Sequence, residues 1–287
     1  MTDASHRYVA DLLFEHTGQQ MTDSRLWRID SALAGLFRER GISNVDQLVC
    51  MLAEHDRQLL TDVIEGLLNN ETYFFRDPAY FDILRRDVLP QLAQQRSRTR
   101  RIAIWSAGCS TGQEVLSLAM LFSEQSARWE GWTIDLLGTD ISGKAIAAAR
   151  QGHYSQFEIQ RGISVTQMLQ FFDERPGGWQ AKDSLREMTR FRQASVFDPP
   201  PQRETDIVLC RNMLLYFEPA NRARAFERLH ESVASDGYLM LGAGETVMGQ
   251  TDRFASAECG GGLYRPTPRP APTQMPERTA LSAALAS

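Results

Sequence analysis

The sequence is poor in cysteine and in long apolar runs, and it has no excess of basic residues. Its net charge is −5, so the balance of charge indicates no nucleic-acid preference, although only two of its 31 basic residues are lysines. The cysteines lie far apart, with no C-x-x-C motif and no paired histidine, so we expect neither a metal site nor a disulfide framework. They are Cys50, Cys109, Cys210 and Cys259.

No apolar run reaches the length of a membrane span, and the N-terminus lacks the basic start and apolar stretch of a signal peptide. We therefore expect a cytoplasmic protein that is not exported and does not insert into a membrane. With 287 residues, 43% of them hydrophobic, the chain can form one or two globular domains. We expect it to be a monomer.

Residues 1–90 are predicted to form an all-helical domain, because apolar residues recur there at helical spacing. Ser43 is predicted to cap a helix that runs through Met51, and Asp77-Pro78 is predicted to begin another helix. One apolar helix face consists of Leu26, Ile29, Leu33, Leu36 and Phe37.

Residues 91–268 alternate between strands and helices, which predicts an α/β domain with a doubly wound, mostly parallel sheet. The predicted strands are 101–107, 133–139, 189–194, 206–211 and 237–243, and the predicted helices are 113–125, 143–151 and 219–234. Residues 152–189 interrupt this order and are expected to form a small inserted subdomain with a helix and a short hairpin. Residues 269–287 are rich in Pro, Thr, Ala and Ser and are expected to be a disordered tail.

The most informative stretch is 104–114, IWSAGCSTGQE, in which a buried strand leads through a turn of small residues into a helix. Gly108 and its neighbours allow backbone N–H groups to approach a ligand closely. Asp140 ends the next strand, where a carboxylate can accept both hydroxyls of a ribose. These features predict a Rossmann-like ligand site and leave the ligand open.

The turn excludes two common ligands. Gly112 is followed by Gln113 rather than by the Lys of a P-loop, so nucleoside triphosphate binding is not expected. The G-x-G-x-x-G spacing of a dinucleotide site is absent, and Glu114 at the helix start would repel a pyrophosphate. A carboxylate there favours an ammonium group. S-adenosylmethionine carries such a group and no phosphate, so the charge pattern favours this cofactor.

Five segments together resemble the CheR family of chemotaxis receptor methyltransferases. They are LNNETYFFRD at 68–77, WSAGCSTGQE at 105–114, TDI at 139–141, CRNMLLYF at 210–217 and DGYL at 236–239. The resemblance spans about residues 10–266 and includes the helical domain. It implies a Rossmann-like, S-adenosylmethionine-dependent methyltransferase domain. Members of the family methylate glutamates on the cytoplasmic signalling helices of chemoreceptors and release S-adenosylhomocysteine.

The resemblance and the turn together give the candidate site. Arg76 and Tyr216 are expected near the reacting methyl group as catalytic residues. Ser195-Val196 stands where the family pattern has Asn-Leu, a departure that bears on the adenine side of the site. The candidate cofactor contacts are Asn70, Thr72, Arg76, Gly108, Glu114, Asp140, Ser195, Val196, Asn212 and Met213.

A glutamate substrate makes a catalytic base unnecessary. Its carboxylate, with a pKa of about 4.3, is already ionised at neutral pH and can attack a sulfonium methyl directly. The enzyme is expected to align the reacting atoms and to exclude water from the attacking carboxylate.

Receptor recognition is less well defined by the sequence. Ala-Gly-Leu at 34–36 occupies the expected centre of the arginine-rich face that the family turns toward acidic receptor helices, so this face is thinner here. In some family members the inserted subdomain captures a receptor's C-terminal pentapeptide by strand addition. The turn at Pro176-Gly-Gly178 is shorter here, so we expect no such tether. The candidates for substrate docking, with a solvated helix face as the alternative, are Arg25, Arg28, Arg38 and Arg40.

Three rival functions stay open. Asp198-Pro-Pro-Pro201 resembles the D-P-P-Y motif of enzymes that methylate bases, but the aromatic residue is absent and a proline turn is favoured. A small-molecule carboxyl methyltransferase would use the same fold. A scaffold that binds the cofactor without activity is the third, and the intact candidate residues argue against it.

Overall fold

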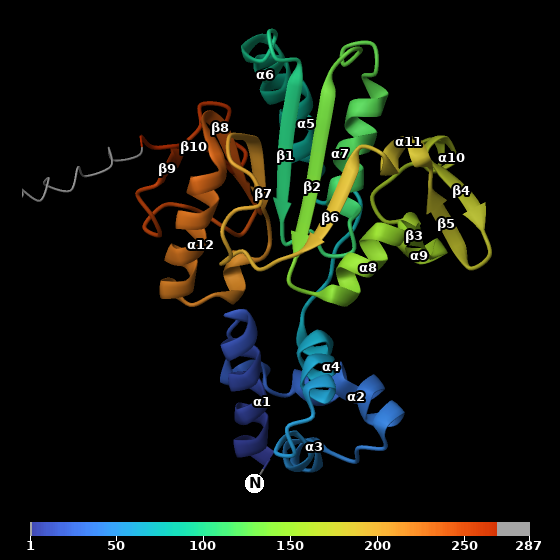
Figure 1. Cartoon of the computed structure of the whole chain (residues 1–287), viewed down its shortest axis with the longest axis vertical. Helices are drawn as coiled ribbons and strands as arrows, with labels where there is room; N and C mark the ends of the chain where they lie inside the picture. Colours follow the sequence, from blue (N-terminus) through green and yellow to red (C-terminus); the bar gives the residue numbers. More distant parts are fainter. Residues whose placement is uncertain (1, 269–287) are drawn as a thin grey trace, which may run out of the picture.

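A seven-stranded sheet forms the centre of the computed structural model, which describes residues 2–268 of the chain (Figure 1). The expected disordered tail, 269–287, lies outside the described residues. The strands lie in the order β6-β2-β1-β7-β8-β10-β9, and the first five of these run parallel. The strands are β1 (Arg101–Ala107), β2 (Thr133–Asp140), β6 (Thr189–Gln193), β7 (Thr205–Cys210), β8 (Val233–Leu241), β9 (Phe254–Ser256) and β10 (Leu263–Pro266).

The predicted doubly wound sheet is confirmed, since helices cover both of its faces. Alternate residues of a strand point to opposite faces. Ile104 therefore packs into one core with α5 to α7, while Trp105 packs into another with α12. These helices are α5 (Pro78–Ile83), α6 (Leu89–Gln95), α7 (Gln113–Glu124), α8 (Gly143–Gln151) and α12 (Pro219–Ser232), with a π-helical turn, η2 (Leu84–Val88), between α5 and α6.

Four helices before residue 68 form a separate core, whose buried residues run from Val9 to Leu67. This helical domain faces the carboxyl ends of the parallel strands (Figure 1). Residues 74–92 pack instead in the core under the sheet. We therefore propose that the helical domain ends near residue 68 rather than at 90. Its elements are α1 (Thr2–Thr17), the 3₁₀ turn η1 (Asp23–Arg25), α2 (Arg28–Arg40), α3 (Val45–Leu52) and α4 (Arg57–Leu67).

The inserted segment forms a subdomain around a three-stranded sheet in the order β3-β5-β4. Strands β4 and β5 make the expected hairpin, with Gly177 at φ 85° in its turn. The elements are β3 (His153–Tyr154), α9 (Gln156–Ile159), α10 (Val165–Phe171), β4 (Phe172–Arg175), β5 (Gly178–Ala181) and α11 (Asp183–Arg186).

The structure corrects three details. The cap of α3 is Asn44, whose side chain accepts from Gln47 N, because Ser43 lies one residue too early. Strand β8 begins at Val233 rather than at 237 and ends at Leu241 rather than at 243. Strands β9 and β10 were not predicted, since both are very short. Within residues 2–268, none of the helices has the length and apolar character needed to span a bilayer.

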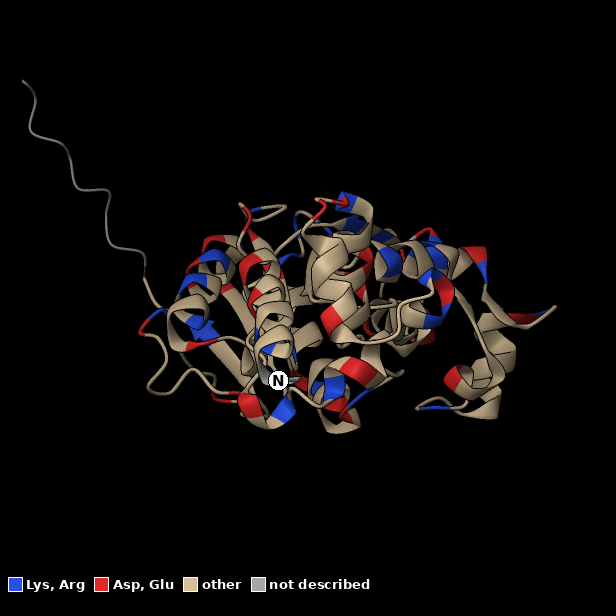
Figure 2. Cartoon of the chain, turned by 90° about the horizontal axis from the view of Figure 1, so that it is seen from below, with Lys and Arg blue, Asp and Glu red and all other residues tan. Residues whose placement is uncertain are grey.

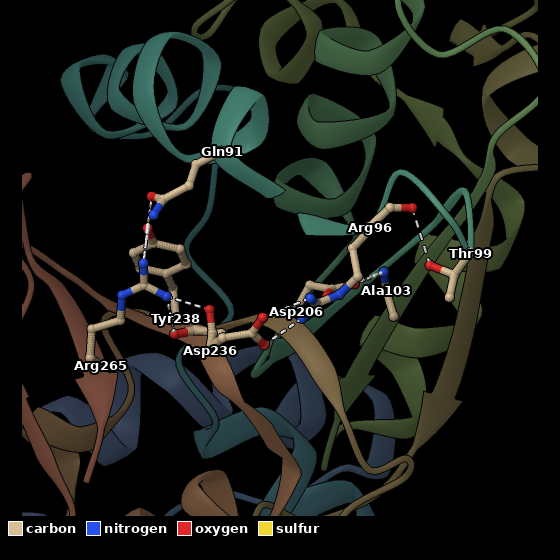
Figure 3. Close-up of polar contacts among 9 residues, drawn as sticks. Gln91, Arg96, Thr99, Ala103, Asp206, Asp236, Tyr238 and Arg265 are labelled. Carbon is tan, nitrogen blue, oxygen red and sulfur yellow. Dashed lines mark hydrogen bonds and ion pairs between the residues drawn. The ribbon is translucent and has the colours of Figure 1, made fainter. Parts of the chain in front are cut away.

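At the end of the sheet away from the helical domain, Arg96 ties α6 to two strands (Figure 3). It donates to Asp206 at 2.7 Å and to both carboxylate oxygens of Asp236 at 2.7 and 2.6 Å. Arg265 stacks over the Tyr238 ring in the same network. These contacts fix α6 to the amino-terminal part of β7 and to β8, at a distance from the ligand-binding end.

Candidate active site

A cleft with about 860 Å³ of space lies between the helical domain and the carboxyl ends of the parallel strands. Strands β6, β2, β1 and β7 are neighbours in the sheet, so the loops after them meet at one edge. The strand order reverses between β1 and β7, and ligands of open α/β sheets bind at such a switch point. All the candidate catalytic and cofactor residues line this cleft: Asn70, Thr72, Arg76, Gly108, Glu114, Asp140, Ser195, Val196, Asn212, Met213 and Tyr216.

The turn after β1 brings backbone close to the centre of the cleft. Gly108 has φ 79°, in the left-handed region that favours glycine, and a Cβ there would lie 2.9 Å from the sulfur of Met213, which would have to move. Ser110 also adopts a left-handed φ, 50°, and its hydroxyl donates to Asn70 O at 2.8 Å. The turn and the segment that enters from the helical domain are thus held together.

Asp140 ends β2 with its carboxylate in the cleft. Its oxygens accept from Ser110 N at 2.8 Å and from Ser142 N at 2.9 Å. Burial raises the pKa of Asp140 above its ordinary value, against the lowering effect of these two bonds. A carboxylate has lone pairs for about four hydrogen bonds, so Asp140 can still accept from two hydroxyl groups.

Glu114, in the first turn of α7, accepts from Ser106 Oγ at 2.8 Å and from Arg211 Nη1 at 2.8 Å. The buried Arg211 also donates to Asp77 Oδ2 and to the backbone oxygen of Arg76, both at 2.7 Å. Arg211 therefore connects the strand β7 loop, the acidic helix start and the loop that carries Arg76. Arg211 is not among the candidate residues expected from the sequence.

Arg76 projects from a strained loop. Its neighbours Phe75 and Asp77 have φ values of 48° and 58°, which cost an L-residue roughly 1–2 kcal/mol each. Ser117 Oγ accepts from Phe75 N at 2.9 Å and so helps to hold this conformation. Such strain concentrates at functional sites, where the surrounding structure enforces it. The half-buried guanidinium of Arg76 lines the cleft and donates to Glu71 O at 3.1 Å.

Asn212, Met213 and Tyr216 follow β7. Asn212 has φ 59°, and its N–H donates to Glu245 Oε2 at 2.7 Å. Tyr216 Oη accepts from Asn69 Nδ2 at 2.6 Å, across the boundary with the helical domain. Glu245 and Asn69, which the sequence did not single out, thus support the loop and the hydroxyl.

Ser195 and Val196 line the cleft just after β6, where Gln193 pairs with Asp140 of β2. Asp198 accepts from Ser195 N at 2.9 Å, so the D-P-P-P segment forms a turn outside the helices and strands. The loop also reaches the segment after β7, since the ring centroids of Phe197 and Phe217 lie 5.0 Å apart.

The four candidate docking arginines lie in two places. Arg25 and Arg28 line a groove that shares Gln19, Asn69 and Tyr216 with the cleft. Arg40 ends α2, about 18 Å from Arg28 at 1.5 Å per residue, and pairs with Asp62 at 2.8 Å. Arg38 is exposed nearby on the same last turn. Seen from the helical side, basic and acidic positions are interspersed (Figure 2).

Comparison with known proteins identifies this architecture. Residues 70–262 match the family described as CheR methyltransferase, SAM binding domain. The chain belongs to the CheR methyltransferase family. It is 32% identical to chemotaxis protein methyltransferase 1 of Pseudomonas aeruginosa, over 86% of this chain and 92% of that protein. It is 30% identical to the chemotaxis protein methyltransferase of Vibrio parahaemolyticus, over 92% of this chain and 96% of that protein.

The cleft fits S-adenosylmethionine, the cofactor of the CheR family. Asp140 has lone pairs left for two further hydrogen bonds, and Arg76 and Glu114 bring opposite charges to the lining of the cleft. Within the described residues, no group of three or more His, Cys, Asp or Glu is placed to hold a metal ion.

Proposed function

We propose that this CheR family member transfers the methyl group of S-adenosylmethionine to glutamate side chains on the signalling helices of chemoreceptors, forming methyl esters. The observation that carries this proposal is the placement of Arg76 and Tyr216 together in the cleft, with no histidine among its lining residues in the described chain. A preionised carboxylate requires groups that orient it and no group that removes a proton. The chemistry of the cleft matches this substrate.

We propose an order of contacts along the cleft from the order of the strands. Ser195 and Val196 after β6 would contact the adenine, and Asp140 after β2 the ribose. Gly108, Glu114, Asn70 and Thr72 would contact the methionyl part, and Asn212 and Met213 would lie beside the reacting end. Adjacent strands are about 4.8 Å apart, so four strand ends span about 14 Å, the scale of an extended nucleoside.

Tyr216 and Arg76 are proposed to orient the substrate. Tyr216 Oη accepts from Asn69, so its own O–H is free to donate to a carboxylate oxygen. Arg76 uses Nη1 for Glu71 O and retains other N–H donors. The cofactor supplies an electrophilic methyl group. Holding the carboxylate in line with that group can contribute about 7–11 kcal/mol, and the helical domain above the cleft limits access of water.

We propose that Arg25 and Arg28 receive the acidic substrate helix, because their groove adjoins Tyr216. Arg38 and Arg40 are at the far end of α2, and the pairing of Arg40 with Asp62 leaves it less available. We also propose that the protein acts as a cytoplasmic monomer. The signalling helices that it would methylate lie on that side of the membrane.

We propose that no C-terminal receptor tether is needed. Strand addition would have to use an edge of the subdomain sheet. Edge strand β4 has only four residues and carries Asp173, Glu174 and Arg175, while the other edge, β3, has two residues. Short, charged edges disfavour the addition of another strand.

The decisive test uses methyl-labelled S-adenosylmethionine and chemoreceptor cytoplasmic fragments. We expect label in the receptor that is released by mild base, as for an ester, and no label with the Tyr216→Phe/Arg76→Ala double variant. Fragments whose methylation-site glutamates are replaced by alanine serve as the control. Base-stable label would indicate an N-methyl product, and label on small acids alone would favour a small-molecule carboxyl methyltransferase.

A further inference from the structure

The helical domain contacts the catalytic domain at the N-terminus of α8. Glu65 of α4 accepts hydrogen bonds there from Ser142 Oγ at 2.5 Å, Gly143 N at 2.6 Å and Lys144 N at 3.3 Å. The first N–H groups of a helix have no partner within the helix. A carboxylate from another domain provides these acceptors, and the positive end of the helix dipole favours its charge.

Ser142 connects this contact to the proposed ribose site. Its hydroxyl donates to Glu65 and accepts from Ala145 N, while its own N–H donates to Asp140 Oδ1 at 2.9 Å. Ser142 is completely buried, so no water can replace these partners. Its N–H and that of Ser110 both donate to the Asp140 carboxylate. Ser142 thus links Glu65 by hydrogen bonds to the Asp140 carboxylate, which would bind the ribose.

Glu65 itself does not line the cleft. It borders an adjoining groove that shares Thr17, Leu68 and Ile141 with the cleft. Glu65 therefore acts on the cofactor site from outside it, through its hydrogen bonds on α8 and through its negative charge, which adds to the effect of burial in raising the pKa of Asp140. Asp62, one turn earlier on α4, provides a comparison, because its hydrogen bonds are with the side chains of Arg40, Gln58 and Lys144 and with no backbone group of α8.

We propose that Glu65 is a positioning residue for cofactor binding, which holds the helical domain on α8 and fixes Asp140 through Ser142. This inference rests on the proposed function only in taking the cleft as the S-adenosylmethionine site. The experiment that tests it measures cofactor binding and not ester formation. A chain that binds the cofactor product but labels no receptor would refute the proposed substrate and still test Glu65.

The experiment compares full-length wild type, Glu65→Ala, Glu65→Gln and Asp62→Asn by calorimetry with S-adenosylhomocysteine. For Glu65→Ala we expect about tenfold weaker binding, equivalent to about 1.4 kcal/mol. KM for S-adenosylmethionine should rise in parallel while kcat at saturating cofactor is retained, because Arg76 and Tyr216 are untouched. Glu65→Gln should be intermediate, since its amide oxygen still accepts but carries no charge. Asp62→Asn should bind like wild type.

Equal affinity of Glu65→Ala and wild type would overturn the proposal. Equal losses in Glu65→Ala and Asp62→Asn would do the same, and so would a fall in kcat with unchanged cofactor affinity. If Glu65→Ala does not fold, amide hydrogen exchange of the wild type decides. Added S-adenosylhomocysteine should slow exchange at Gly143 and Lys144, and unchanged rates at both would contradict the proposed coupling.

Discussion

Among single residues, Asp140 combines burial, two backbone donors and a free face toward the cleft. We expect Asp140→Ala to weaken S-adenosylhomocysteine binding by about ten- to hundredfold, because a lost charge-assisted hydrogen bond costs about 1.5–3 kcal/mol. Calorimetry measures the change. Glu130→Ala, which removes an exposed carboxylate before β2, at the opposite end of that strand from Asp140, is the control. Unchanged affinity in Asp140→Ala would remove this residue from the ribose site.

The raised pKa of Asp140 predicts a pH effect on cofactor binding. Since burial favours its protonated form, the carboxylate loses its charge at a higher pH than an exposed aspartate does. Affinity for S-adenosylhomocysteine should therefore fall as the pH decreases from neutral through this raised pKa. The stability of the ligand-free protein should depend on pH in the opposite direction. A carboxyl group whose pKa is raised in the folded state contributes stability at low pH, and this contribution is lost as the pH rises.

The measurement is calorimetric titration over a series of pH values. Asp140→Asn should bind more weakly and show a flatter dependence, since it has no proton to gain. A pH dependence of the same steepness in this variant would assign the effect to another group.

Methyl transfer is expected to depend on Arg76 and Tyr216 and on no histidine, because none of the five histidines lines the cleft. Each single change of His6, His16, His55, His153 or His230 to glutamine should leave kcat within about threefold of wild type, whereas loss of a transition-state contact typically costs tenfold or more. The measurement is initial rates on receptor fragments. A folded histidine variant that binds cofactor without turnover would contradict the mechanism without a base.

A residue of the site can be predicted from the sequence when a local pattern marks its position. Gly108, Glu114 and Asp140 lie at fixed places around a strand-turn-helix, so the sequence alone located them. Arg211 and Glu245 act across 97 and 33 positions of the chain, on Glu114 and Asn212 respectively. No local pattern marks such long-range pairs, because only the packed strands bring them together.

At the scale of elements, Arg96 holds α6 against β7 and β8 (Figure 3). Arg96→Ala would leave the carboxylate of Asp206, whose side chain is 4% exposed, without its ion-pair partner. We expect a loss of about 3 kcal/mol in the free energy of unfolding, the lower end for breaking a buried pair. Chemical denaturation measures it, with the exposed Arg98→Ala as the control. Equal stability of the two variants would show that the Arg96 network contributes nothing to the free energy of unfolding.

The short, charged edge strand of the inserted subdomain predicts that the protein recognises its receptor without binding the receptor's C-terminal peptide. Receptor fragments with and without their C-terminal extension should be methylated at the same rate, and the isolated terminal peptide should not bind at micromolar concentration. Rate assays and peptide titration test both statements. Binding of the peptide, or slower methylation of the truncated receptor, would instead make the subdomain a docking module.

Long, strongly patterned elements were predicted to within a few residues, and α8 and β1 agree at both ends with the predicted ranges. Strands β9 and β10, of three and four residues, were missed because their pairing depends on each other and on β8 rather than on a periodic pattern. The first four residues of β8, 233–236, were also missed. Its pairing with β7 is irregular between Thr205 and Ile207, which lengthens the strand beyond its apolar run.

For the whole molecule, apolar residues at helical spacing predict a helical part before an α/β part, and we propose that the junction lies near residue 68 rather than at 90. The helices at 78–95 have the same amphipathic pattern as those before residue 68, and only packing assigns them to the sheet. Residues of the helical part and of the sheet part together line the cleft. Gln19 pairs with Phe217, and Glu65 and Asn69 reach across to Ser142 and Tyr216.

The position of β10 between β8 and β9 has a consequence for synthesis on the ribosome. The helical core closes with residue 67, so it can form early, before any strand of the sheet has been made. The sheet cannot close until Leu263–Pro266 have emerged, because β9 bonds to the rest of the sheet only through β10. Until then β8 presents an unpaired edge, the kind of surface on which other chains add. A nascent chain that stops short of Leu263 should therefore depend on chaperones, although its cofactor-binding strands are already complete.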